Sequence, residues 1–340
     1  MPQASAGALA AFSTSVLRAA GANEASAEAA TRAMNHASLH GIDSHGYRLL
    51  PFYAECLRVG LAKGAPALAV RPLRHAAACV DADGGLGHSA TYRAMEEACT
   101  LAGACGVGLA LVINSTHFGA AGAYALAAAE AGYIGFVASN SGALVVPHGG
   151  TKPLHGTNPI ALAAPDPGGE PFLLDMATSS IPWNKVLKYR SEHTELPPFV
   201  AVDSDGAFVS DANSASALAP VGGPQFGYKG AGLAGFVDVL GGVLTGMRLS
   251  FEQDGRSLGD TALGHFVLAI DPSLVMTIEA FGLRLRSYLQ SFKSQPGTYA
   301  AGGPEWERRR EREASGIPLS EALAAELRAA GQSTGVAAPF

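Results

Sequence analysis

The stretch VGLALVINSTHFGAAG, residues 107–122, runs from an apolar, β-branched segment directly into a cluster of small and polar residues. Its first part, residues 107–113, is predicted to form a buried strand, and residues 119–131 are predicted to form a helix. Small residues and free backbone N–H groups at a helix N-terminus suit a pyrophosphate. The same glycines also permit a tight, closely packed turn, so the stretch alone leaves both interpretations open.

Around this stretch, short apolar runs alternate with Ala-rich segments from residue 67 onward. Such alternation is typical of a doubly wound α/β fold, which carries a G-x-G-x-x-G fingerprint after one strand. The nearest candidates, residues 84–87 and 119–122, lack that spacing and the acidic residue about 20 positions later. The sequence therefore disfavours a Rossmann fold. The other expected strands are 77–81, 133–139, 160–164, 171–174 and 265–270, and the other expected helices are 88–104, 229–246 and 273–291.

Both ends of the chain are predicted to be helical. A first helix is expected over 4–20, and a second over 24–40 begins after Asn23 as N-cap and ends at Gly41. A third is expected over 47–59, ending at Gly60, and a fourth over 319–330. The charged tail from residue 302 is expected to pack back on the N-terminal helices.

Composition narrows the class of protein. The chain has 340 residues, 48% of them apolar and only 15% charged, with a formal net charge of -6. This predicts two interlocked domains, large buried or subunit-covered surfaces, and a homo-oligomer. The longest basic run, residues 308–310, is surrounded by glutamates, which disfavours nucleic acid as a partner.

Two further patterns bear on the expected location of the protein. The four cysteines, Cys56, Cys79, Cys99 and Cys105, show no C-x-x-C pair, so reduced thiols in the cytoplasm are expected. The N-terminus lacks the pattern of a signal peptide. The most apolar segment, residues 231–247, is shorter than a membrane span and is predicted to be a buried helix.

The most concentrated polar cluster contains HGIDSHG, residues 40–46, at a helix end and the loop beyond it. A histidine beside a hydroxyl suits proton donation near neutral pH, and the nearby Arg48 is able to hold a carboxylate. His36 and His40 also have the spacing of metal ligands, so a metal-dependent hydrolase using them with His45 is an alternative. A third interpretation is that these histidines cap helix ends or fill polar gaps in the core.

Two more glycine-containing clusters follow, at residues 149–159 and 226–233. In the second, Lys229 at a predicted helix start is placed to pair with a phosphate. Because the G-x-x-x-x-G-K-[ST] pattern is absent, ATP chemistry is not indicated.

Taken together, these stretches resemble the type-2 malate/L-lactate dehydrogenase family. The matching segments follow the family order over nearly the whole chain: HGIDSHGYRL (40–49), NSTHFGAAG (114–122), GGTKPLHGTNPIALAAP (149–165), FLLDMATS (172–179), VDSDG (202–206), FGYKGAGL (226–233) and GGPEWERRRERE (302–313). The resemblance implies an α/β, α+β-like, non-Rossmann fold. A helical domain would comprise residues 1–66 and 300–340, and a mixed, largely antiparallel cofactor and substrate domain residues 67–299, in a homodimer.

The resemblance also implies a function: NADH- or NADPH-dependent reduction of a small 2-oxo acid or cyclic 2-imino acid, or the reverse oxidation. His45 would be the proton donor with Ser44 relaying to it, His117 the second candidate, and Arg48 the ligand of the substrate carboxylate. Thr157 would lie near the substrate. The cofactor contacts implied are His117, Phe118, Gly119, Ala120, Ala121, Ser139, Asn140, Ser141, Asp175, Met176, Ala177 and Lys229, and no metal is implied.

The chain departs from the family pattern at residues 180–185, SIPWNK. Lys185 occupies the relay position that is acidic in one reductase branch. Trp183 and Asn184 stand where smaller groups are usual, which predicts a reshaped substrate pocket, although Trp183 at a subunit interface is an equal alternative. The sequence leaves open the substrate and the choice between NADH and NADPH. It also leaves open a non-catalytic binding protein that keeps the fold.

Overall fold

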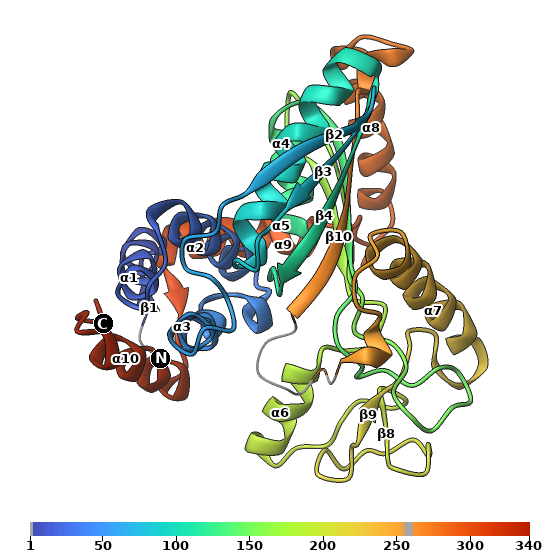
Figure 1. The fold of residues 1–340 in the computed structure, drawn as a ribbon. Coiled ribbons are helices and arrows are strands. Elements are labelled where there is room, and N and C mark those ends of the chain that lie inside the picture. Colours follow the sequence, from blue (N-terminus) through green and yellow to red (C-terminus); the bar gives the residue numbers. More distant parts are fainter. Residues whose placement is uncertain (1–2, 254, 256–260) are drawn as a thin grey trace.

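The computed structural model describes residues 3–253, 255 and 261–340. Its strands and its helices, among which η marks short 3-10 or π segments, follow in chain order (Figure 1). They are β1 (Gln3–Ala4), α1 (Ala6–Ala19), α2 (Glu24–Leu39), η1 (Asp43–His45), η2 (Tyr47–Leu49), α3 (Leu50–Arg58), β2 (Ala69–Arg74), β3 (Ala77–Asp81), α4 (Gly87–Cys105), β4 (Val107–Thr116), α5 (Gly122–Glu130), β5 (Ile134–Ser139), β6 (Ile160–Ala164), β7 (Phe172–Met176), α6 (Trp183–Glu192), β8 (Ala201–Val202), β9 (Ala217–Leu218), α7 (Gly223–Asp238), η3 (Val239–Val243), η4 (Ser250–Glu252), β10 (Thr261–Ile270), η5 (Pro272–Leu274), α8 (Ile278–Lys293), α9 (Gly303–Ser315), β11 (Ile317–Pro318) and α10 (Glu321–Thr334).

A twisted seven-stranded sheet forms the centre of the molecule, in the order β2-β3-β4-β10-β5-β6-β7 (Figure 1). Only β3 and β4 run parallel; the other neighbouring pairs of the described sheet are antiparallel. Strand β10 comes late in the chain yet lies between β4 and β5. This mixed, largely antiparallel sheet was predicted and is confirmed.

Two apolar clusters stabilise the fold. The larger contains small residues of α4 and α5 packed on β4, β5 and β6, for example Ala98, Ala125 and Ala161. The second is made by the two chain ends, where Leu9 and Phe12 of α1 pack with Leu327 of α10. The C-terminal tail therefore packs on the N-terminal helices as predicted, because burying both amphipathic faces together removes apolar surface from water.

Local signals for helix ends were reliable. Asn23 is the N-cap of α2 and accepts a hydrogen bond from the backbone of Ser26. Gly41 and Gly60 adopt the left-handed conformation expected after a helix, with φ of 79° and 74°.

Other expectations need correction. The apolar segment 231–247 is largely helical but only partly buried, since Ala234 and Val237 are buried whereas Phe236, Val239 and Val243 are exposed. No helix in the described part of the chain is long and apolar enough to span a membrane. Helices α6 and α9 and strand β2 were not predicted, because their polar sequences carry little apolar periodicity. The cysteines are free, although Cys105 is exposed.

Candidate active site

A cavity of about 760 Å³ lies where the ends of several strands meet the loop after α2. Strands β4, β5 and β7 each deliver a loop to it, and α6 closes one side. The candidate site residues that line it are Ser44, His45, His117, Phe118, Gly119, Ala120, Ala121, Ser139, Asn140, Ser141, Thr157, Asp175, Met176, Ala177, Trp183 and Asn184. Segments far apart in the sequence, from Ile42 to Leu263, thus share one pocket.

His45 reaches the cavity from η1, a single turn that follows Ile42. The Nδ1 atom of its ring lies 2.9 Å from Ser44 Oγ, which leaves Nε2 for a ligand. Burial lowers the pKa of His45 to about 4, because a charged imidazole loses its hydration there. In the free protein at neutral pH this imidazole is therefore uncharged.

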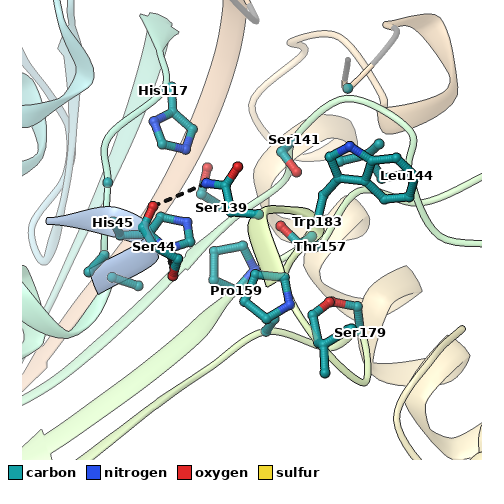
Figure 2. Close-up of a pocket in the computed structure, with 18 of the residues that line it drawn as sticks. Ser44, His45, His117, Ser139, Ser141, Leu144, Thr157, Pro159, Ser179 and Trp183 are labelled. Carbon is teal, nitrogen blue, oxygen red and sulfur yellow. Dashed lines mark hydrogen bonds between the residues drawn. The ribbon is translucent and has the colours of Figure 1, made fainter. Parts of the chain in front are cut away.

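His117 lies beside His45. The two rings are nearly parallel, with centroids 5.9 Å apart, and both stand on one side of the cavity (Figure 2). The Nδ1 atom of His117 is 2.8 Å from the hydroxyl of the buried Tyr53. Burial lowers the pKa of His117 well below its usual value, and the proximity of His45 lowers it further. Each imidazole thus has a hydroxyl at Nδ1 and a free edge for proton exchange.

The turn between β4 and α5 is shaped by close backbone approach. Gly119 has a φ of 76°, which favours glycine. At Gly122 the backbone N–H donates to Asp175 Oδ2 over 3.0 Å, and a Cβ there would lie 2.7 Å from the same oxygen. Burial raises the pKa of Asp175 to about 6, although this hydrogen bond opposes the shift. The Asp175 carboxyl group therefore accepts a hydrogen bond from the first backbone N–H group of α5.

The loop after β5 supplies polar atoms to the cavity. The Ser139 hydroxyl lies 2.7 Å from Nδ1 of the buried His265 and donates to the Asn140 carbonyl, so it is engaged within the protein. In contrast, Asn140 Oδ1 and Ser141 Oγ are buried without a hydrogen-bond partner. Unpaired buried polar atoms at a cavity wall are typical of a site that pairs with a polar ligand.

Three predicted site residues do not line this cavity: Arg48, Lys185 and Lys229 are exposed in this chain. The arginine that does line it is Arg190 of α6, which sequence reasoning missed. Arg190 lies seven positions after Trp183 and therefore on the same helix face, but that signal required α6 to be predicted first.

Arg190 is held in place by two backbone carbonyls. Its Nε and Nη2 atoms donate to Ala212 and Ala215 over 2.6 and 2.7 Å. Its guanidinium carbon lies 5.3 Å from the ring centre of Trp183. Trp183 stands across the cavity from His45 and His117, beside Leu144 (Figure 2).

The metal alternative does not fit the geometry. The rings of His36 and His40 pack against each other in a tilted arrangement with centroids 4.2 Å apart, and His40 Nδ1 lies 2.8 Å from the carbonyl oxygen of His36. His45 instead faces the cavity. Within the described ranges no group of three or more His, Cys, Asp or Glu side chains is arranged to hold a metal ion. The spacing that suggested metal ligands instead places the two rings in contact with each other, and His40 meets the ring of Trp306 edge-on.

The fold and the cavity define an α/β protein in which two neighbouring imidazoles, His45 and His117, line one cavity. Comparison with known proteins names the group: the model of the Malate/L-lactate dehydrogenase family matches residues 4–328. The chain belongs to this family. The prediction of a dehydrogenase or reductase is therefore confirmed.

Relatives of this chain carry several dehydrogenase names. It is 37% identical to a malate dehydrogenase of Pyrococcus abyssi, over 83% of this chain and 80% of that one. It is 34% identical to the ureidoglycolate dehydrogenase (NAD(+)) of Escherichia coli, over 76% and 74%. It is 33% identical to a (2R)-3-sulfolactate dehydrogenase (NADP(+)) of Chromohalobacter salexigens, over 94% and 95%.

Solved structures agree with the fold over the whole chain. The malate dehydrogenase of Pyrococcus horikoshii has a TM-score of 0.89 at 32% identity, covering 99% of this chain and 97% of that one. The delta1-piperideine-2-carboxylate reductase of Pseudomonas syringae has a TM-score of 0.88 at 29% identity, covering 97% and 100%.

Proposed function

We propose that this protein transfers a hydride between a nicotinamide cofactor and C2 of a small 2-oxo acid or cyclic 2-imino acid. The observation that carries the proposal is the pair of partly buried imidazoles, His45 and His117, facing one cavity in a family of dehydrogenases and reductases. Names of relatives support both substrate types, since they include dehydrogenases of malate and sulfolactate and a reductase of a cyclic imino acid.

The cavity fits a nicotinamide cofactor. The unpaired Asn140 Oδ1 and Ser141 Oγ suit a carboxamide, which both donates and accepts hydrogen bonds. The small residues Gly119, Ala120 and Ala121 leave room for a large ligand, and Met176 and Ala177 would complete its contacts. When bound, such a cofactor supplies or accepts the hydride. We propose that it binds without a Rossmann fingerprint, which the antiparallel sheet supports.

His45 would handle the proton. In oxidation, its neutral Nε2 accepts the hydroxyl proton as the hydride leaves C2; in reduction, the protonated ring returns that proton to the oxygen or nitrogen. Burial lowers the pKa of His45 to about 4 and so favours the accepting form. A bound carboxylate nearby would favour the protonated form during reduction. Ser44 would relay protons to Nδ1 of His45. The second candidate for the proton donor or acceptor is His117.

The substrate carboxylate needs a cation. Arg48 is the first candidate by resemblance, and it follows directly on the turn that contains His45, but it lies outside the cavity lining of this chain. Arg190 is the second candidate, favoured because it lines the cavity. Replacing the true anchor by Lys should raise KM at least about tenfold, because a bidentate hydrogen-bonded pair is lost. Steady-state kinetics of R48K and R190K would therefore separate the two, and unchanged KM in both would refute both roles.

Further proposals follow from the resemblance. Thr157, Trp183 and Asn184 would contact the substrate, and their position in the cavity lining supports this. Lys185 would act in a proton relay, and Lys229 would pair with the cofactor phosphates.

The proposed division into domains comprises a helical domain, residues 1–66 with 300–340, and a cofactor domain, residues 67–299. The apolar cluster of the two chain ends supports it. The free cysteines support a cytoplasmic location.

One assay tests the proposed reaction. Pyruvate, oxaloacetate, sulfopyruvate and Δ1-piperideine-2-carboxylate would each be offered with NADH and NADPH, and ureidoglycolate with the oxidised cofactors, and the nicotinamide absorbance followed. Turnover of at least one pair is expected. If none of these pairs is turned over, the proposed function fails for these substrates.

The variant H45A tests the proton donor. It should lower kcat roughly a hundredfold or more, because a positioned acid or base contributes about that much, while cofactor binding persists. Cofactor fluorescence titration provides the control. Full turnover by H45A would remove His45 from the role.

A further inference from the structure

The turn that carries Ser44 and His45 has little support of its own. Segment η1, Asp43–His45, has no buried residue, and Ile42 caps it with no side-chain hydrogen bond. Within the segment, the backbone N–H of His45 bonds only to the carbonyl of Ile42, at 3.0 Å. Contacts from elsewhere in the fold must therefore determine where His45 points.

The strongest such contact comes from the opposite end of the chain. Arg312 lies on α9 and is buried, with 7% of its surface exposed. Its guanidinium forms a two-pronged ion pair with Asp43, with Nη2 donating to Oδ2 over 3.0 Å and Nη1 donating to Oδ1. The two residues are 269 positions apart in the sequence. A planar fork of this kind fixes direction as well as distance.

Arg312 also reaches the helix before the turn. Its Nη1 atom donates to the carbonyl of Ser38 in α2, and the Ser38 hydroxyl accepts the backbone N–H of Tyr47 over 3.0 Å. The chain passes so close at Gly46 that a Cβ there would lie 2.1 Å from the Ser38 hydroxyl. Arg312 therefore ties the start of the turn to the same residue that holds its end.

A second contact supports the turn from the cavity side. The Asn184 side chain at the start of α6 donates to the carbonyl of Ser44 over 3.1 Å. Helices α6 and α9 thus hold η1 from different directions. Among the residues that the structure describes, Arg312 is the one charged side chain that forms an ion pair with the turn.

We infer that Arg312 and Asp43 form a positioning pair that holds Ser44 and His45 at the cavity. The inference rests on the role of His45 under the proposed function. The Asp43 side chain is 58% exposed, so solvent screens the attraction between the two charges. The main effect of the pair is to fix the orientation of the turn. Arg312, in contrast, is buried and needs a partner for its charge.

The variants D43N and R312K test the pair. D43N keeps the shape but weakens the ionic fork, and R312K keeps the charge but loses the second prong. Both should lower kcat about tenfold to a hundredfold, since a misplacement of about 1 Å is that costly, with cofactor affinity unchanged. The solvent deuterium isotope effect on kcat should rise, because proton transfer becomes slower. The double variant should be no worse than the more impaired single one.

E170Q is the matched control. It breaks the exposed ion pair between Glu170, which precedes β7, and Arg310, which lies on α9 like Arg312. This ion pair does not involve the turn. It should leave kcat and the isotope effect unchanged. Thermal melts of all variants verify folding. If R312K fails to fold, D43N, which changes the exposed partner, still tests the positioning pair.

Parallel measurement of H45A separates the two hypotheses. If H45A loses turnover while D43N and R312K keep theirs, the positioning role is overturned and the proposed function stands. If H45A keeps turnover, His45 is not the proton donor, and hydrogen exchange of the peptide that spans residues 43–47 then decides whether the pair holds the turn. Faster exchange in D43N than in E170Q would support the pair as the holder of the turn, and equal exchange would overturn it.

Discussion

At the scale of single residues, burial determines the charge of the histidines near the cavity. The pKa values of His40 and His45 fall to about 4, and those of His88 and His265 to about 3, chiefly because burial removes hydration from the charged form. His88 is fully buried, and neither of its ring nitrogens has a hydrogen-bond partner. The protein therefore folds with these rings neutral.

This neutrality predicts loss of stability in acid. In the unfolded chain these histidines take up protons near pH 6.5, whereas in the folded chain they do so only near pH 3 to 4. Between these values the unfolded state binds more protons, so stability should fall as the pH is lowered from about 6.5 to 4. Thermal midpoints measured from pH 7 to pH 4 would show this decline. In H88Q the decline should be shallower, because about one proton fewer is taken up on unfolding. A flat profile in the wild type would contradict this explanation.

At the scale of elements, α6 begins within the segment 180–185 and contributes several residues to the cavity lining. Trp183, Asn184, Leu187 and Arg190 recur at helical spacing and line the cavity, so one face of α6 forms its wall. The opposite face is solvated and carries Lys188 paired with Glu192. The departure SIPWNK therefore lies at the cavity as well as at the start of the helix.

The variant W183A should impair the use of the substrate more than the binding of the cofactor. Removal of the indole leaves apolar cavity wall unfilled, so kcat/KM for the preferred substrate should fall about tenfold, while the cofactor dissociation constant stays within about twofold. K188A on the solvated face provides the control and should behave as wild type. A fall in cofactor affinity equal to the fall in kcat/KM would argue against a substrate-side role for Trp183.

At the scale of the whole molecule, α7 and η3 present an exposed apolar face. Phe236, Val239, Val243 and Leu244 are 46%, 54%, 61% and 51% exposed. Adjacent exposed apolar side chains of this number mark an interaction surface in soluble proteins. We propose that a second copy of the chain covers this face, which agrees with the homo-oligomer expected from the low charge content and with the homodimer that the family resemblance implies.

V243D should weaken that association. A charge at the centre of an apolar interface loses hydration without gaining a partner, so the variant should shift towards monomer at micromolar concentration. Analytical ultracentrifugation would measure the shift. V59D, at an exposed valine after α3, is the control and should keep the wild-type mass. A monomeric wild type, or an unaltered V243D assembly, would contradict the proposed face.

Much of this could be predicted from the sequence, because it depends on neighbouring residues. Asn23 capped α2, Gly41 and Gly60 ended helices, and strands such as β3 and β6 had the predicted bounds. These features follow from local backbone preferences and short apolar periods. The motifs around His45, His117 and Asp175 likewise indicated residues that line one cavity. Helices α6 and α9 escaped prediction because tertiary contacts, and not apolar periodicity, hold them.

Only the tertiary structure decided which distant side chains meet. The order of the sheet, with β10 between β4 and β5, brings His265 to Ser139. The packing of α9 brings Arg312 to Asp43, 269 positions away. The position of α6 places Arg190 in the cavity lining, whereas Arg48 of η2 is not part of that lining. Local sequence determines which elements can form, but contacts between elements depend on how their apolar faces are buried together, and no short pattern encodes that.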